Sequence, residues 1–517
     1  MAKDVTDNKR IAKNATILYI RMFFIMAISF YTSRIVLQAL GVSDYGIYNV
    51  VGGVTVLINV FISALGSSTS RFLTFALGKN DIEVLKRTFT TALWVHIGLA
   101  VLFAVVAETI GLWFINTQLV IPEGRMVAAN WVYQSAVVSV VMGITQTPYS
   151  ASVTSHERMS TYAVIEVLLS LCKLGVAAIV LYYSGDHLVL YSILYALLSI
   201  SYQCYYRFYC MRNFEECHIT KWFDTSLFKD MLKFSSWTML GSVSLTFMNQ
   251  GMNVMINRFF GTLLNAASGV ALQVQGLLYT FRGNTTLAFS PQIIKSYSAS
   301  NFDRVIQLIG MGTKFSVVIE AMAIVPLIIN MDFLMSIWLK EVPDGAAVIC
   351  QILLLTNLLN SFNPFVNTAI IASGRIKNVN IVVSIIYVLF VIGTYCILKY
   401  THSYVWAYLF CVLVSPISTI IYLFTFKKIL PSFSVGQFLK TTYFPLMLTG
   451  ALSIVISFVI HNVIDDKLIA FLATLFFSFV FISLTAYFML FNNELRMMIN
   501  SFVLNNFMKG WLKKNEK

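Results

Sequence analysis

Long apolar runs recur along almost the whole chain, and they restrict its fold more than any other feature. A helix of roughly 20 residues spans about 30 Å, which is the thickness of the hydrocarbon core of a bilayer. Hydrophobic residues make up 58% of the 517 residues and charged residues only 11%, which is far outside the range of soluble domains. Strands of a membrane barrel would instead alternate apolar and polar residues. The sequence therefore predicts an all-α polytopic membrane protein.

We predict fourteen transmembrane helices from these runs. Their approximate bounds are 15–38, 47–66, 89–114, 127–149, 161–183, 188–209, 235–257, 267–289, 305–330, 346–370, 379–398, 404–426, 441–461 and 468–491. Of the 36 lysines and arginines, 26 fall in tails and loops on one side of these spans and five on the other. Because cytoplasmic segments are enriched in these residues, we expect both termini to be cytoplasmic.

The same distribution explains the net charge of +13 without a nucleic-acid partner, because the basic clusters lie at predicted membrane edges. The first 13 residues carry four basic residues and run directly into a full-length span, so we expect no cleavable signal sequence. The seven cysteines show no CxxC pair and no matching histidine spacing, which predicts small core residues and no metal site.

The stretch 14–81 has a counterpart 220 positions later, at 234–301. Each copy holds an apolar run, a turn opened by glycine, and a second apolar run that ends in polar residues. The identities in register are Gly41/Gly261, Val50/Val270, Leu57/Leu277, Phe61/Phe281 and Ser70/Ser290. Later matches are Pro122 and Gly124 with Pro343 and Gly345, Pro148 with Pro364, and Tyr183 and Tyr191 with Tyr400 and Tyr408.

This duplication predicts two homologous six-helix lobes, as in many secondary transporters. We expect parallel repeats related by a pseudo-two-fold axis along the membrane normal. The predicted lobes are 1–217 and 218–430, while 431–517 would add two extra helices and a tail lying on the inner surface.

We single out eight charged residues within the predicted spans, where a charge costs several kcal/mol unless it meets water or a partner. They are Arg21, Arg34, Glu108, Glu166, Lys173, Arg282, Lys314 and Glu320. Five of the eight are cationic, so a cavity lined by them would attract an anion. We therefore expect a substrate phosphate to bind at Arg282, Arg21, Arg34, Lys173 and Lys314.

Arg282 is the foremost of these candidates, because it lies deep in its span beside a Gly-Asn-Thr-Thr run that can hydrate the helix. The planar fork of an arginine also matches the geometry of phosphate oxygens. Each candidate has a structural alternative. Arg21 and Arg34 could extend to the interface, Glu166 and Lys173 could form a charge pair, and Glu108 could be interfacial.

Neutral polar residues in two spans of the second lobe could bind sugar hydroxyls or form interhelical hydrogen bonds. They are Asn249, Gln250, Asn253 and Gln273. Candidates for coupling to an ion are Glu166, Glu320 and His96, although a lone buried imidazole bonded to its neighbour is the alternative for His96.

The sequence resembles the Wzx-type oligosaccharide flippases, a polysaccharide-transport branch of the multidrug/oligosaccharidyl-lipid/polysaccharide (MOP) exporter superfamily. The resemblance rests on Lys13-Asn14-Ala15-Thr16, Ser33-Arg34 through Gly41, Asp44-Tyr45-Gly46-Ile47-Tyr48, and Cys217-His218-Ile219 before Trp222-Phe223-Asp224. It implies a MATE-like fold with a central cavity that opens alternately to each side. It further implies that undecaprenyl-pyrophosphate-linked oligosaccharide moves to the outer leaflet of the bacterial cytoplasmic (inner) membrane.

In the related lipid II flippases, arginines of the first and eighth spans line the cavity, which implies this role for Arg21 and Arg282, and less directly for Arg34. The extra helix pair resembles the lipid-accommodating pair of those flippases. Implied partners are the lipid-linked oligosaccharide, membrane lipids, and the polymerase and glycosyltransferases of the same pathway. No cofactor is implied.

Other functions remain open at this point. A MATE-type drug or cation antiporter would predict acidic residues deep in the first lobe, whereas cations predominate here. A membrane glycan polymerase or ligase is disfavoured by the short outer loops, and a channel by the duplication. The chain contains no GxxxxGK[ST] run, so we expect a transporter without an ATP site and not an enzyme.

Overall fold

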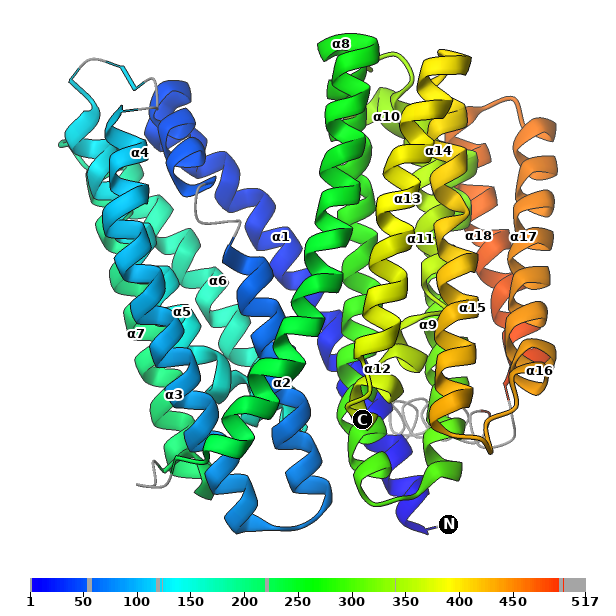
Figure 1. The fold of residues 1–517 in the computed structure, drawn as a ribbon. Coiled ribbons are helices and arrows are strands. Elements are labelled where there is room, and N and C mark those ends of the chain that lie inside the picture. The colour runs from blue at the N-terminus through cyan, green and yellow to red at the C-terminus, as the bar shows by residue number, and fades with distance from the viewer. Residues whose placement is uncertain are drawn as a thin grey trace, which may run out of the picture. The chain divides into compact units, whose positions relative to one another are not determined.

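The structure, a computed structural model, describes residues 2–53, 58–117, 121–122, 124–218, 223–339, 341–491 and 496. Within these ranges all regular structure is helical and there is no strand (Figure 1). The first helices are α1 (Ala2–Gly53), α2 (Ile58–Gly78), α3 (Ile82–Val106), α4 (Leu112–Thr117), α5 (Met126–Ser155), α6 (Met159–Leu181) and α7 (His187–Asn213). The prediction of an all-α fold is confirmed.

The long helix α8 (Thr225–Ser298) opens the second half of the chain. It is followed by α9 (Phe302–Ile329), α10 (Met331–Trp338), α11 (Ala346–Asn360), α12 (Pro364–Ser373), α13 (Lys377–Thr401), α14 (Tyr404–Val412), α15 (Val414–Ile429), α16 (Val435–Phe438), α17 (Phe444–Val463) and α18 (Lys467–Thr485). The predicted inner-surface tail lies almost wholly outside the described residues.

Ten described helical stretches are long and apolar enough to cross a membrane, and α11 with α12, bent by 45°, makes an eleventh. The other three predicted spans, 47–66, 235–257 and 267–289, fall on α1 with α2 and on α8. These stretches are not among the ten, because residues 54–57 lie outside the described ranges and α8 carries many polar side chains. A polytopic membrane protein is confirmed, whereas the count of fourteen is not.

Two glycines at matched positions of the repeat break otherwise continuous helices. Gly41 in α1 has φ 72° and ψ 170°, and Gly261 in α8 has φ 79° and ψ −169°. A side chain would make this backbone conformation unfavourable, so glycine is needed at both positions. Gly124 and Gly345, matched in the same way, have φ of 80° and 82°. The sequence repeat is thus also a repeat of backbone conformation.

The described chain divides into two compact units. Unit 1 comprises Met1–Ala15 and Val243–Lys517, and unit 2 comprises Thr16–Ser242. The start of α1 packs in unit 1, where Arg304 of α9 donates a hydrogen bond to Asn8. The start of α8 packs in unit 2, where the rings of Phe72 and Phe234 meet edge-on at 6.0 Å. Each unit therefore includes a helical segment of the other predicted lobe, namely the start of α1 in unit 1 and the start of α8 in unit 2.

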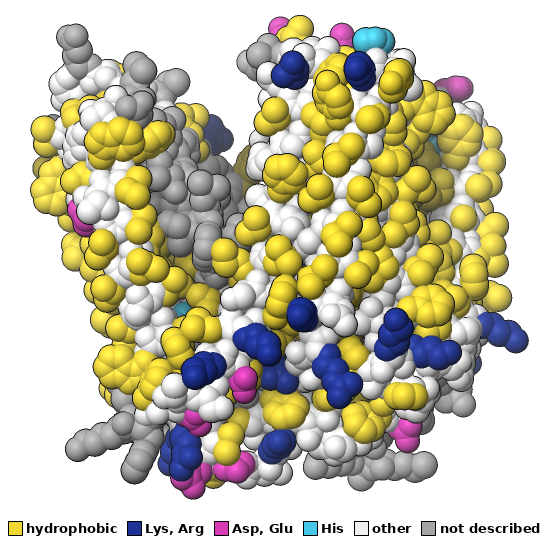
Figure 2. All heavy atoms as spheres, viewed as in Figure 1, with side chains coloured by type: hydrophobic (Ala, Val, Ile, Leu, Met, Phe, Trp, Pro, Cys, Tyr) yellow, Lys and Arg dark blue, Asp and Glu magenta, His cyan; other side chains and the backbone are white. Residues whose placement is uncertain are grey.

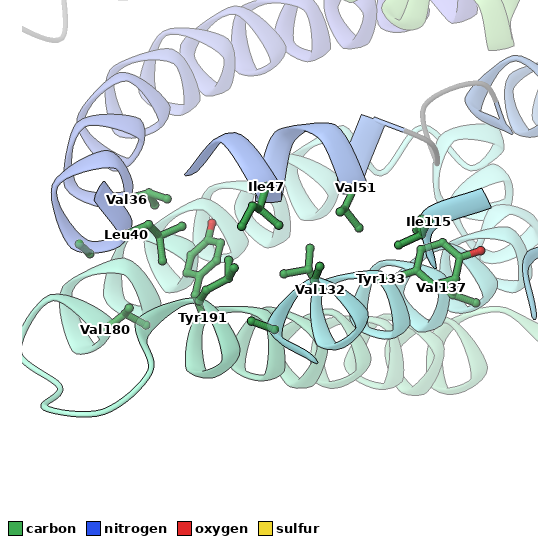
Figure 3. Packing of buried hydrophobic residues seen from close by; sticks show 14 of the residues in the cluster. Val36, Leu40, Ile47, Val51, Ile115, Val132, Tyr133, Val137, Val180 and Tyr191 are labelled. Carbon is green, nitrogen blue, oxygen red and sulfur yellow. The ribbon is translucent and has the colours of Figure 1, made fainter. Parts of the chain in front are cut away.

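Unit 2 is held by apolar packing of α1 against helices α4 to α7, with Ile47 and Val51 of α1 facing the cluster of Figure 3. Lipid tails are as apolar as these side chains, so close van der Waals contact, and not exclusion of water, holds such helices together. Tyr133 is 1% exposed, and its hydroxyl donates to the Ala107 carbonyl at 2.7 Å, inside a π-helical turn that spans Ala107–Gly111.

The extra pair α17 and α18 is attached to unit 1 by a polar contact in an apolar surrounding. The side-chain amide of Asn330, at the end of α9, donates to Thr474 of α18 at 2.8 Å. Its amide oxygen lies 2.9 Å from Nδ1 of His461 in α17. Because an unsatisfied polar group is costly in hydrocarbon, these bonds fix how the pair sits on α9.

An ion cluster joins three segments at one end of unit 2. Nε of Arg125 donates to Asp44 at 3.0 Å, and Nη1 donates to Asp186 at 2.6 Å. Asp186 also caps α7 by accepting from the backbone N–H groups of Leu188 and Val189. The Arg125 guanidinium therefore holds the pKa of Asp186 below its ordinary value.

Replacing Asp186 by Asn should destabilise the protein at neutral pH by about 1 kcal/mol, since the pair is partly exposed and screened. A lowered folded-state pKa means that the contribution is full above the unfolded-state value, near 4, and is lost as the pH falls through the folded-state pKa. Thermal unfolding of both proteins between pH 3 and 7 should show the difference closing at low pH. Glu83→Gln, which removes an exposed i,i+4 pair with Arg87, is the control. A gap that widens in acid would contradict the assignment.

Candidate functional site

A buried polar cluster in unit 1 brings together residues from α8, α9 and the junction of α11 with α12. We call it the Glu320 cluster, and it consists of Glu320, Ser316, Ser361, Asn357 and Arg282. The site predictions from the sequence included Arg282 and Glu320, and the structure places both in this cluster.

Glu320 is 1% exposed on α9. Its carboxylate accepts a hydrogen bond of 2.6 Å from the Ser361 hydroxyl and one of 3.1 Å from the Ser316 hydroxyl, one helical turn earlier. Arg282 is linked to the same cluster through the Asn357 carbonyl, which lies 3.4 Å from its Nη1 and 3.1 Å from the Ser361 hydroxyl. Within the described residues, the direct hydrogen bonds to Glu320 thus come from hydroxyls and not from a cation.

Arg282 is 7% exposed in the part of α8 that follows the Gly261 break. Its Nη1 donates to the Asn357 carbonyl at 3.4 Å, and its guanidinium lies 4.2 Å from the ring centroid of Tyr279. An aromatic face stabilises a cation without adding a negative charge. Among the described residues, the direct contacts of the Arg282 guanidinium are therefore a carbonyl and an aromatic ring, and it forms no ion pair.

The bend between α11 and α12 supplies the polar partners of both charges. Ser361 caps the end of α11, and its hydroxyl is also 3.1 Å from the Asn357 carbonyl. Pro364, the first residue of α12, has no N–H to continue the helical ladder. The side-chain amide nitrogen of Asn357 is buried and, among the described residues, has no hydrogen-bond partner. The interrupted helix thus offers polar atoms where a continuous helix would offer none.

Sequence reasoning missed Ser316, Ser361 and Asn357, which complete the cluster. The available signal was the run from Asn360 to Pro364 inside a predicted span, because a proline preceded by polar residues marks a helix break. It also missed Arg207 of α7, which donates to Thr145 of α5 and lies 5.7 Å from the ring of Tyr149.

The neutral candidates lie on α8, on both sides of Gly261. Asn249, Gln250 and Gln273 are exposed, and Asn253 is half-buried with its amide 3.5 Å from Gln250. Exposed amides are costly against lipid tails, so this face of unit 1 requires water or polar partners. The structure does not bring these amides to the Glu320 cluster.

The candidate site residues of unit 2 mainly contact tyrosine side chains. The guanidinium of Arg21 lies 4.8 Å from the ring centroid of Tyr162, and the ammonium of Lys173 lies 5.3 Å from that of Tyr195. Glu166 accepts a hydrogen bond of 2.8 Å from Tyr202. The structure thus connects Glu166 and Lys173 to different tyrosines of α7.

The remaining candidates are scattered. Arg34 is exposed on α1, and Glu108 is exposed and bonded to Gln134. His96 is fully buried with Nδ1 2.8 Å from the Ala92 carbonyl, and its Nε2 has no partner in the described part of the chain. Lys314 lines a separate cavity beside the first half of α9. Across the described ranges, no group of three or more His, Cys, Asp or Glu is arranged to hold a metal ion.

No family model and no curated protein matches the sequence. Solved structures do match its fold. A MATE transporter from Vibrio cholerae superposes with a TM-score of 0.69 at 14% identity, over 84% of this chain and 99% of that one. A MOP-superfamily transporter from Pyrococcus furiosus, described as having a binding pocket of reverse polarity, gives 0.69 at 14% identity, over 81% of this chain and 95% of that one.

An outward-facing multidrug-resistance MATE transporter gives a TM-score of 0.67 at 15% identity, over 81% of this chain and 95% of that one. The chain thus has the fold of MATE transporters of the MOP superfamily. Part of it has no counterpart in these structures, because they cover no more than 84% of its length.

Replacing Ser361 by Ala should destabilise unit 1 by about 1–3 kcal/mol, because the buried Glu320 carboxylate loses its shortest hydrogen bond. Ser336→Ala on α10 is the matched control, since that hydroxyl is exposed and bonds only to its own helix. Thermal unfolding of the purified proteins in detergent provides the comparison. Equal melting temperatures for the two variants would show that Ser361 does not support the carboxylate.

Proposed function

We propose that the protein is a secondary transporter that works by alternating access and exchanges a monovalent cation or proton at Glu320. The observation that carries the proposal is a buried carboxylate held by hydroxyls beside an interrupted helix. Intramembrane carboxylates of this kind commonly belong to ion pathways. An interrupted helix supplies free polar atoms for an ion and can change its bend.

The cargo that the comparisons favour is a drug-like or cationic solute, since transporters with this fold include multidrug MATE proteins. A MATE-type antiporter needs a site that is negatively charged when it is open to one side of the membrane and neutral when it is open to the other side. Glu320 can meet this need, because proton or cation binding would cancel its charge while Ser316 and Ser361 remain as partners.

A second cargo, a lipid-linked oligosaccharide, is supported by the positive charge and the exposed amides of α8. Arg282 would bind the pyrophosphate, and the roles of Arg21, Arg34, Lys173 and Lys314 stay predictions from the sequence. Asn249, Gln250, Asn253 and Gln273 would bind the sugar hydroxyls. The protein would then act in the bacterial cytoplasmic membrane with both termini in the cytoplasm, beside glycosyltransferases and a polymerase.

Replacing Glu320 by Gln should reduce gradient-driven transport by at least about tenfold, because the amide keeps the shape and cannot bind a proton. Proteoliposomes that hold the purified protein would be given a proton or sodium gradient, and ethidium movement would be followed by fluorescence. Glu108→Gln, which alters an exposed carboxylate bonded to Gln134, should transport normally. Undiminished gradient-driven transport by the Glu320 variant would rule out this carboxylate as the coupling site.

Replacing Arg282 by Ala should distinguish between the two proposed cargoes. If the cargo carries a pyrophosphate, flipping of a fluorescent undecaprenyl-pyrophosphate oligosaccharide in proteoliposomes should fall by at least about tenfold and recover partly with Arg282→Lys. Ethidium transport by wild type would instead support the antiporter. Arg258→Ala, an exposed arginine on the same helix, is the control. Normal flipping by a stable Arg282→Ala protein would refute the phosphate role.

A further inference from the structure

A cavity of about 470 Å³ lies within unit 1, away from the Glu320 cluster. One wall is a single face of α9, where the lining residues recur every three or four positions from Asp303 to Lys314. The opposite wall comes from the α15–α16 connection and the π-helical turn Leu439–Tyr443, which precedes the extra helix pair. The cavity therefore lies where the extra pair joins the repeated fold.

Lys314 is the charged group at the deeper end of this cavity. It is half-buried, and in the described part of the chain it makes no hydrogen bond or ion pair. A side chain on a helix points back toward the helix start, so the Lys314 stem extends along the cavity wall. An ammonium group in such a place gains more from an anion than an exposed lysine would.

The other polar lining groups are hydrogen-bond donors suited to phosphate oxygens. Ser432 and Ser434 contribute hydroxyls, and Gln307 and Gln437 contribute amides, whereas the Thr441 hydroxyl already donates to the Gln437 carbonyl at 2.8 Å. The one carboxylate of the lining is exposed Asp303, eleven residues before Lys314 and thus about 16 Å away along the helix axis. It stands at the opposite end of the wall and leaves the lysine end positive.

Further basic residues flank the cavity wall in the sequence. Lys427 and Lys428 lie in the last turn of α15, and Lys440 precedes the lining residue Thr441. All three lysines are exposed. Figure 2 shows lysine and arginine side chains gathered over this end of unit 1. Such a cluster raises the local concentration of anions and marks the membrane edge that we predict to face the cytoplasm.

We propose that this cavity binds a phosphate-bearing polar group, with Lys314 as its charge partner, the hydroxyls of Ser432 and Ser434 as donors, and the lining amides as further donors. The apolar side chains of Ile306, Met311 and Phe438 line the same space and would contact the carbon part of the ligand. The ligand would bridge α9 and the segment 432–442, which precedes the extra helix pair. Two sources share this chemistry, namely the headgroup of an anionic lipid and a soluble phosphate ester.

The test uses the purified full-length protein, delipidated in a neutral detergent, with phosphatidylglycerol as one probe and glycerol phosphate as the other. Native mass spectrometry would count retained lipid, with phosphatidylcholine as the neutral reference. We expect selective retention of phosphatidylglycerol or binding of glycerol phosphate by wild type. Lys314→Gln should lower the affinity of the bound probe by at least about tenfold, because one charge-assisted contact is lost.

Gly310→Leu is a second variant, because a Cβ added at this lining residue meets only the Thr442 hydroxyl, at 4.0 Å, and the rest of a leucine would extend into the cavity. Lys428→Gln, an exposed lysine outside the lining, should stay within about twofold of wild type. Both cavity variants should keep the wild-type melting temperature in the absence of probe. Displacement of the lipid by glycerol phosphate assigns the site to a soluble ester, and failure to displace it assigns the site to the lipid.

The proposal is overturned if wild type binds neither probe, or if Lys314→Gln and Gly310→Leu bind as wild type does. It is also overturned if Lys428→Gln loses as much affinity as Lys314→Gln, because surface charge alone would then account for binding. None of these outcomes depends on transport, so the site can fail while the proposed function stands.

Discussion

The arrangement of polar residues in unit 1 depends on the free-energy cost of leaving a polar group without a hydrogen-bond partner inside a membrane. A carboxylate as deeply buried as Glu320 is tolerated only where donors reach it, and the backbone of a regular helix presents none because its N–H groups are already bonded. The break between α11 and α12 provides Ser361, and Ser316 adds a second hydroxyl from α9 itself. The bent helix and the buried charge therefore depend on each other.

The same constraint explains how the rest of the fold is assembled. Asn330, His461 and Thr474 satisfy one another where the extra pair meets α9, and Arg125, Asp44 and Asp186 do so at one end of unit 2. Between these points packing is apolar and close, as in the α1 cluster of Figure 3. Polar contacts fix the register, and van der Waals contact fills the space.

Sequence patterns were sufficient for the helical fold because length, hydropathy and the repeat are local or periodic signals. Gly41 and Gly261 even pointed to matched backbone breaks. Sequence patterns were insufficient for the site, since Ser316 and Ser361 are common residues whose role depends on Glu320, which lies 4 and 41 positions away. The entry of α1 and α8 into the opposite units was not predictable either, because no local pattern records which helix a segment will pack against.

The chemistry of the site is not duplicated along with the fold. At the 220-residue offset, Arg282 corresponds to Ile62 and Glu320 to Ala100, so the first repeat carries neither charge. At the offset of the matched prolines, Ser361 corresponds to Thr145, which lies inside the continuous helix α5. The first repeat thus has Pro148 without the interruption, and it has no carboxylate there that an interruption would serve. In the second repeat a buried charge and an interrupted span meet at one place, whereas the matched positions of the first repeat carry neither, which is why we propose unit 1 for the coupling step.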